Sequence, residues 1–112
     1  MQTDVATVLV RMLNDDIVDA NDVARALGTS LRTVGRWQAN EVAPRRESEE
    51  RLLELKAVVD LVHKHLRSGP ARLWLRSPNP DLDYEKPIEV IAAGEYRRVI
   101  AAVLAMAEGV TA

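Results

Sequence analysis

Apolar residues recur along nearly the whole chain at intervals of three or four positions, which is the spacing of an amphipathic helix. The first such segment, residues 3–13, places its apolar side chains at Val5, Val8, Leu9 and Met12. Either Thr3 or Asp4 can cap its N-terminus. No segment alternates clearly between apolar and polar residues as a strand does, so the pattern predicts an all-α fold.

Two short helices are predicted next, over the sequences "ANDVARAL" and "LRTVGRWQAN". Asp19 can cap the first of them, and Asp22 three positions later makes a weak capping box. Gly28 stands where this helix must end, in a position typical of left-handed backbone, and Ser30 can cap the second helix. The inner faces are predicted to be Val23, Ala24 and Leu27 on the first helix, and Val34 and Trp37 on the second.

A long helix is predicted after Pro44, through "ESEERLLELKAVVDLVHKHLRSG". Its apolar stripe steps by three and four residues through Leu52, Leu55, Val59, Val62 and Leu66. Leu53, Val58 and Leu61 widen this stripe. An apolar arc of that width is typical of a helix that is buried on two sides.

The C-terminal third contains a proline-rich break. Pro70 is predicted to start a helix, "ARLWLR", and the residues before Pro78 and Pro80 are predicted to be extended. The acidic run "DLDYEK" is predicted to be a solvated connector. Pro87 then starts a short helix that Gly94 ends.

The last predicted helix is "EYRRVIAAVLAMAEG". It is predicted to bury Tyr96, Val99, Ile100, Val103 and Leu104, and to expose Ala101, Ala102 and Ala105. An exposed alanine face favours the close approach of another helix or surface. The alternative is that alanine is present only because it is the strongest helix former.

Residues 20–39 match a DNA-binding helix-turn-helix in four features. Ala24 is small where the helices cross, Gly28 permits the turn, and Val34 and Trp37 anchor the second helix in the core. The side chains predicted to face DNA are Ser30, Leu31, Arg32 and Arg36, with Arg45 and Arg46 placed for phosphates. The alternative is a helical hairpin with solvated arginines.

Charge is unevenly distributed along the 112 residues. Residues 23–46 contain five arginines and one glutamate, a net charge of +4, whereas the whole chain carries −2 and the remainder therefore −6. This asymmetry indicates an anion-facing surface on an otherwise acidic protein.

Several function classes lack their required residues. The chain has no cysteine, which excludes disulfides, zinc–thiolate sites and thiol catalysis and fits a cytoplasmic protein. His63 and His65 lie two positions apart on a helix, so they cannot hold one metal ion together. No phosphate-binding glycine loop, nucleophile motif, signal peptide or membrane-spanning run occurs. We therefore expect no enzymatic activity, no metal, no cofactor and no membrane partner.

The C-terminal half also carries a specific compound motif behind the helix-turn-helix. It consists of Trp74-Leu75-Arg76-Ser77-Pro78-Asn79-Pro80, then Pro87, then Gly94-Glu95 with Val99. With this motif the chain resembles, over essentially its whole length, the Xre/MbcA/ParS group of bacterial type II antitoxins. Its terminal "AMAEGV" is especially similar to the short mycobacterial MbcA type, and its acidic connector departs from the family pattern.

The resemblance implies two regions, a helix-turn-helix DNA-binding domain over residues 1–46 and a helical toxin-binding and dimerisation domain over residues 47–112. Antitoxins of this group bind and neutralise a RES-domain toxin that is encoded beside them and consumes NAD. They tend to form homodimers, and many repress their own operon by binding operator DNA. A stand-alone dimeric transcription regulator is the alternative.

Two sets of residues follow from this resemblance and from the helix pattern. The residues expected to contact the toxin are Arg97, Arg98, Ala101, Ala105, Glu108, Gly109 and Val110. The residues expected to shape the structure are Trp37, Trp74, Pro78, Asn79, Pro80 and Gly94. For the two arginines, simple solvation of the last helix remains an open alternative.

Overall fold

The computed structural model describes the backbone of residues 4–111 and the side chains of residues 4–109. Within this range the elements are α1 (Val5–Asn14), α2 (Ala20–Leu27), α3 (Leu31–Gln38), α4 (Arg46–His65), α5 (Ser68–Arg76), the 3₁₀ turn η1 (Pro80–Leu82), α6 (Pro87–Ala92) and α7 (Tyr96–Thr111). The described chain contains no strand, only an isolated β-bridge between Asn79 and Glu85. The predicted all-α fold is confirmed.

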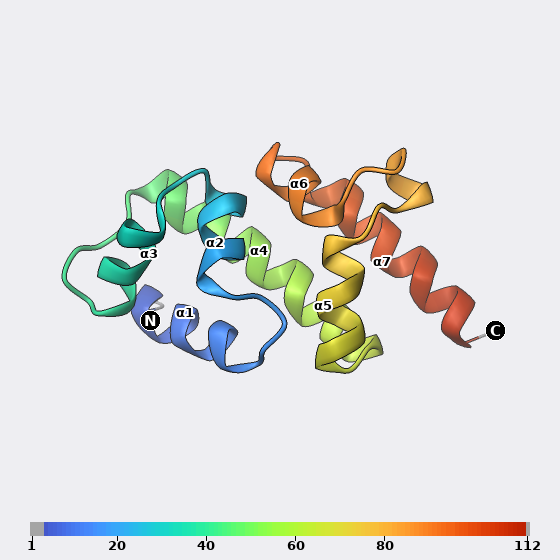
Figure 1. Cartoon of the computed structure of the whole chain (residues 1–112), viewed down its shortest axis with the longest axis horizontal. Coiled ribbons are helices and arrows are strands. Elements are labelled where there is room, and N and C mark those ends of the chain that lie inside the picture. Colours follow the sequence, from blue (N-terminus) through green and yellow to red (C-terminus); the bar gives the residue numbers. More distant parts are fainter. Residues whose placement is uncertain (1–3, 112) are drawn as a thin grey trace.

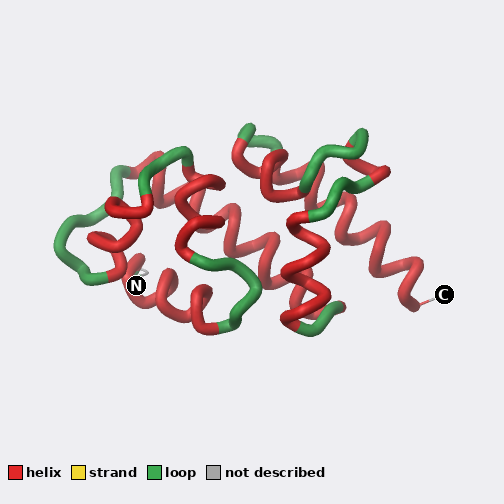
Figure 2. The backbone as a smooth tube through the Cα atoms, in the orientation of Figure 1, coloured by secondary structure: helices red, strands yellow, loops and turns green. Residues whose placement is uncertain are grey.

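The helices form an elongated bundle of 45 × 25 × 23 Å. Figure 1 shows α1, α2 and α3 gathered at one end and α5, α6 and α7 at the other, with α4 running behind both groups. The two groups also meet directly, because α2 packs against α6. The connections over residues 39–45 and 77–86 run around the outside of the bundle (Figure 2).

The caps predicted for the N-terminal helices are present. The Asp4 side chain accepts a hydrogen bond from Ala6 N, and that of Ser30 accepts one from Thr33 N. Asp19 and Asp22 form a complete capping box, in which each carboxylate accepts the backbone N–H of the other residue. These bonds satisfy N–H groups that have no partner within the helix and so fix where each helix begins.

Two glycines end helices in left-handed backbone, where other residues are strained. Gly28 ends α2 with φ +67°, and its N–H donates to Ala24 O and Arg25 O. Gly94 follows α6 with φ +85°, and a Cβ at this position would lie 3.1 Å from Nη2 of Arg51. Arg51 in turn donates from Nη1 to Ile91 O at 3.0 Å, so a side chain of α4 closes the end of α6.

The core lies around α4, whose apolar arc packs against both groups of helices, but Leu53, which was predicted to widen the buried stripe, is 41% exposed. Its buried residues are Leu52, Leu55, Val58, Val59 and Val62. One continuous cluster joins them to Leu9, Val23, Val34 and Trp37 from the first group of helices and to Leu75, Val99 and Val103 from the second. Trp37 is 5% exposed, as expected for a core residue, and Trp74 is partly buried against the same cluster.

The prediction for the last helix is wrong at two positions. Leu104 is 49% exposed, and Ala102 is buried together with Val99, Val103 and Ala107. Leu104 follows Val103 and is therefore turned about 100° from it around the helix axis, away from α4. The small Ala102 allows close packing on the buried side, while Ala101 and Ala105 are exposed as predicted.

The connector after α5 is more ordered than a solvated segment. Ser77 and Asn79 are extended before their prolines, as predicted. The chain then folds back, because Asn79 N–H donates to Glu85 O while Asn79 O accepts from Leu82 N and Tyr84 N. Leu82 is 1% exposed, so the expectation of a fully solvated connector is wrong at this residue.

Pro70 does not start α5. The helix begins at Ser68 and Pro70 is its third residue. Proline is tolerated there because N–H groups of the first helical turn have no acceptor within the helix. The hydroxyl of Ser68 donates to Asp15 O at 2.9 Å and so ties the start of α5 to the loop before α2.

Candidate functional site

The outward face of α3 carries the residues predicted to meet DNA. Leu31 is 51% exposed, and Arg32 and Arg36 are exposed one turn apart. Arg36 lies 3.7 Å from Glu41, while no ion pair of Arg32 forms within the described part of the chain. The hydroxyl of Ser30 is occupied as the helix cap and as a donor to Thr33 Oγ1.

A glycine in the middle of α3 leaves this face open. A Cβ at Gly35 would meet no atom within 4 Å. Packing inside the molecule therefore does not require glycine there, although glycine in a helix costs about 1 kcal/mol relative to alanine. Arg45 and Arg46 are exposed just beyond, at the start of α4, where Arg46 pairs with Glu50 at 3.3 Å.

The outward face of α7 forms a second exposed surface. Arg97, Ala101 and Ala105 are exposed as predicted, and so are Glu108 and Gly109. Leu104 lies on the same side and is the residue of this face that the sequence pattern missed, because it was assigned to the core. The side chain of Val110 lies outside the described residues.

Arg98 differs from its neighbour Arg97, because three carboxylates of its own chain surround it. Its guanidinium lies 3.2 Å from Glu95, 3.4 Å from Glu85 and 3.5 Å from Asp83. Its side chain is only 37% exposed. Arg98 therefore holds the acidic connector against α7 within the chain, and its contact with a partner stays a prediction.

Two arginines of α5 join the C-terminal helices to the capping box of α2. Arg72 Nη2 donates to Asp19 Oδ2 at 3.1 Å. Arg76 donates to the same oxygen at 3.2 Å and to both carboxylate oxygens of Asp22. The Asp22 side chain is only 12% exposed, and the residues joined are 53 to 57 positions apart in sequence.

The surroundings of Asp19 and Arg76 favour the charged form of each side chain. Burial acts to raise the pKa of Asp19, but the Asp22 N–H and the two arginines outweigh it and hold that pKa below its usual value. Burial likewise acts to lower the pKa of Arg76, and the two carboxylates outweigh it and raise that pKa. A further pair, Arg25 to Glu89 at 2.5 Å, joins α2 to α6.

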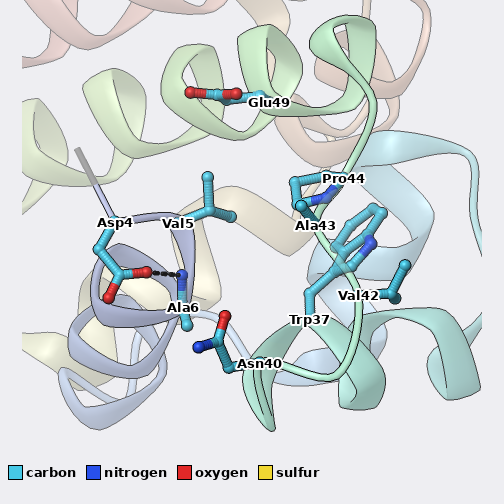
Figure 3. A pocket seen from close by; sticks show the side chains of 9 residues that line it. All are labelled: Asp4, Val5, Ala6, Trp37, Asn40, Val42, Ala43, Pro44 and Glu49. Atoms are coloured by element: carbon cyan, nitrogen blue, oxygen red, sulfur yellow. Dashed lines mark hydrogen bonds between the residues drawn. The ribbon is translucent and has the colours of Figure 1, made fainter. Parts of the chain in front are cut away.

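A pocket of about 410 Å³ opens between the start of α1, the end of α3 and the 39–45 loop (Figure 3). Its lining residues are Asp4, Val5, Ala6, Trp37, Asn40, Val42, Ala43, Pro44 and Glu49. No histidine, cysteine or hydroxyl side chain is among them, and the Asp4 carboxylate is already used as the cap of α1. The pocket therefore offers no hydroxyl, thiol or imidazole side chain as a nucleophile or base.

Two other kinds of site are absent from the described residues. No three side chains of the metal-binding types lie together there. No helix in the same range combines the length and apolar character needed to cross a membrane.

Comparison with known proteins decides the family. The sequence profile of the "Antitoxin Xre/MbcA/ParS C-terminal toxin-binding domain" matches residues 68–109. The mycobacterial cidal antitoxin MbcA of Mycobacterium tuberculosis is 43% identical over 95 residues, which span 85% of this chain and 76% of MbcA. The chain belongs to the Xre/MbcA/ParS family of antitoxins.

Two further relatives extend the family match over nearly the whole chain. A probable mycobacterial cidal antitoxin of M. tuberculosis is 29% identical over 104 residues, 93% of this chain and 89% of its own length. A solved structure that matches is a chain of the M. tuberculosis MbcT–MbcA toxin–antitoxin complex. It superposes with a TM-score of 0.83 at 34% identity and covers 96% of this Xre/MbcA/ParS family member and 97% of the matched chain.

Proposed function

We propose that this protein is the antitoxin of a type II toxin–antitoxin pair in the cytoplasm, and that it binds and neutralises a RES-domain toxin that consumes NAD. The observation that carries the proposal is the match of residues 68–109 to a toxin-binding domain. These residues include nearly all of α7, whose outward face is exposed and apolar in part. A binding protein rather than an enzyme also agrees with the lining of the pocket in Figure 3.

The proposed toxin-contacting residues are those on the outward face of α7. They are Arg97, Ala101, Leu104, Ala105, Glu108 and Gly109. Positions three, four and seven residues apart on one helix are the usual anchors when a helix binds in a groove. The acidic remainder of the chain favours a partner whose cleft is basic, because complementary charge speeds encounter.

Co-expression with the neighbouring gene tests this function. We expect the neighbour alone to stop growth and deplete cellular NAD, and this protein to restore both. A version that ends at Glu108 lacks the last four residues, Gly109–Ala112. We expect this truncation to bind the toxin at least about tenfold more weakly, a loss of about 1.4 kcal/mol.

The truncation keeps every residue of the described core, so its melting temperature should equal that of the full chain. Val10→Ala is the control and should bind the toxin normally, since Val10 is exposed on α1, outside the residues that match the toxin-binding domain. A harmless neighbour would contradict the antitoxin function itself. Full neutralisation by the truncated chain would contradict only the role of the last residues.

A second proposed function is binding of operator DNA through α3. The observation that favours it is the exposure of Arg32, Arg36, Arg45 and Arg46 around one helix whose centre, Gly35, is open to close approach. The N-terminal half of the second helix of such motifs enters the major groove. In this arrangement Arg32 reaches base edges, and Arg45 and Arg46 meet phosphates.

Gel-shift titration with the upstream region of the gene pair tests this second function. We expect Arg32→Ala to lose about 1–3 kcal/mol of discrimination between operator and unrelated DNA. Arg45→Ala should weaken binding to both duplexes by a similar factor. If Arg32→Ala matches the unmodified protein on every duplex, α3 does not read bases.

A further inference from the structure

A tyrosine at the tip of the connector, residues 81–86, is left uncovered by the rest of the chain. Tyr84 is 71% exposed, the largest fraction among the large hydrophobic side chains of the described residues. Aromatic rings bury more area than most side chains when they are covered, and tyrosine is enriched among the residues that contribute most to binding between proteins. The tip is therefore a candidate contact surface for another protein.

The fold itself does not require a tyrosine at this position. Tyr84 has φ +65° and follows Asp83 with φ +55°, so both residues lie in left-handed backbone, which a bulky side chain rarely adopts. Glycine would hold the same turn without this strain. Because the ring is exposed, packing within the chain does little to offset the strain. A contact made outside the chain accounts for the tyrosine.

The tip is held in place on both sides of Tyr84. Arg98 pairs with Asp83 at 3.5 Å and with Glu85 at 3.4 Å, the residues directly before and after the tyrosine. The N–H of Tyr84 donates to Asn79 O at 2.8 Å, and Asn79 is itself buried. A contact loop that is already ordered loses less conformational freedom on binding, which favours affinity.

The tip adjoins the outward face of α7. The turn η1 packs against α7 (Figure 1), and Arg98, which holds the tip, belongs to that helix. Ala101 and Ala105 are three and seven positions after Arg98, so they lie on the same side of α7. All of these residues fall within 68–109, the range that matches the toxin-binding domain. A protein bound to the outward face of α7 would therefore reach the tip as well.

The charge of the tip indicates the chemistry of the partner. Residues 81–86 contain three carboxylates and one lysine, a net charge of −2, and Arg98 is shared with Glu95 at 3.2 Å. A toxin that consumes NAD must bind a pyrophosphate, a group that proteins bind with arginine and lysine side chains. We propose that Tyr84 contacts the toxin, with its ring in an apolar cleft bordered by cationic side chains. This inference rests on the proposed antitoxin function.

Titration of each variant with the purified product of the neighbouring gene tests the contact. We expect Tyr84→Gly to bind the toxin at least about tenfold more weakly. Its melting temperature should not fall, because the relief of left-handed backbone offsets the greater freedom of glycine in the unfolded chain. Tyr84→Phe should bind within about threefold of the unmodified chain, since an apolar cleft accepts either ring.

Asn40→Gly is the matched control. Asn40 also has left-handed backbone, with φ +61°, but it lies outside residues 68–109, so this variant should bind the toxin normally. Asp81→Asn tests the cationic border. Asp81 is exposed and forms no ion pair within the described chain. Loss of its charge should slow association about threefold and reduce the dependence of that rate on salt.

Equal toxin affinity of Tyr84→Gly and the unmodified chain would overturn the inference and leave the antitoxin function in place. An unmodified chain that binds no toxin would overturn the proposed function, and this inference with it. If Tyr84→Gly changes only the sedimentation of the chain without toxin, a second copy covers the tip and the toxin does not. A Tyr84→Phe variant as weak as Tyr84→Gly would overturn the apolar cleft, and an unchanged association rate of Asp81→Asn would overturn its cationic border.

Discussion

Replacing Leu55 by alanine should lower the free energy of unfolding by about 2–5 kcal/mol. Leu55 is fully buried in the middle of α4, in the cluster that joins both groups of helices. The loss is large against a total stability of about 5–15 kcal/mol for a domain of this size. Because the core is continuous, we expect both halves of the chain to lose stability together.

The fluorescence of the two tryptophans can show whether both halves of the chain unfold together. Trp37 reports on α3 and Trp74 on α5, and a Trp→Phe change at either position leaves one reporter. In urea the two reporters should give one coincident transition, as two-state unfolding requires. Leu73→Ala is the control and should cost less than about 0.5 kcal/mol, since Leu73 is 68% exposed. If Leu55→Ala shifts only one reporter, residues 1–46 and 47–112 fold independently.

Removal of Arg76 has the second large expected effect. At pH 7 we expect Arg76→Gln to cost about 1–2 kcal/mol, because Asp22 loses its charged donor in a largely buried position. The exposed pair between α2 and α6 provides the control. Arg25→Gln should cost less than about 1 kcal/mol, as is typical of surface ion pairs. Equal losses in the two variants would contradict a special role for the network.

The effect of Arg76→Gln should depend on pH. The pKa of Asp19 in the folded protein lies below its unfolded value of about 3.9, so the unfolded chain binds protons first as the pH falls. The stabilisation from Asp19 is therefore complete above about pH 4 and is lost as the pH falls through the folded pKa. Urea titrations at pH 7, 4 and 2.5 should show the difference between the unmodified protein and Arg76→Gln shrinking with acidity. A constant difference would exclude the carboxylates as its source.

Local signals in the sequence predicted the boundaries of α2 and the start of α3 well. Asp19, Gly28 and Ser30 each act on backbone groups within four residues, so their types and spacing are enough to locate the turns of the helix-turn-helix. The wide arc on α4 likewise predicted contact with both groups of helices, although it did not predict that Leu53 at the edge of the arc is 41% exposed.

Contacts between residues far apart in the sequence have no comparable local signal in the sequence. The ion pairs of Arg72 and Arg76 join residues more than 50 positions away, and no local pattern distinguishes these arginines from solvated ones. Alanine-rich α7 was ambiguous for a different reason. Small side chains fit both a buried and an exposed face, so the placement of Ala102 and Leu104 depended on the rotation of α7 against α4. Which surfaces meet toxin, DNA or a second copy is untested and stays a prediction.

The double use of the Asp19–Asp22 capping box limits how parts of such proteins can be exchanged. These carboxylates begin α2 and at the same time hold two arginines of α5, so neither half of the network is replaceable alone. A chimera that joins this helix-turn-helix to the C-terminal half of a relative must supply arginines at positions 72 and 76. Without them the largely buried Asp22 would lose its charged donor, and Asp19 would lose both of its arginine partners. A chimera of this fold must therefore keep both sides of this charge network together, and a junction chosen only because it lies in a linker would separate them.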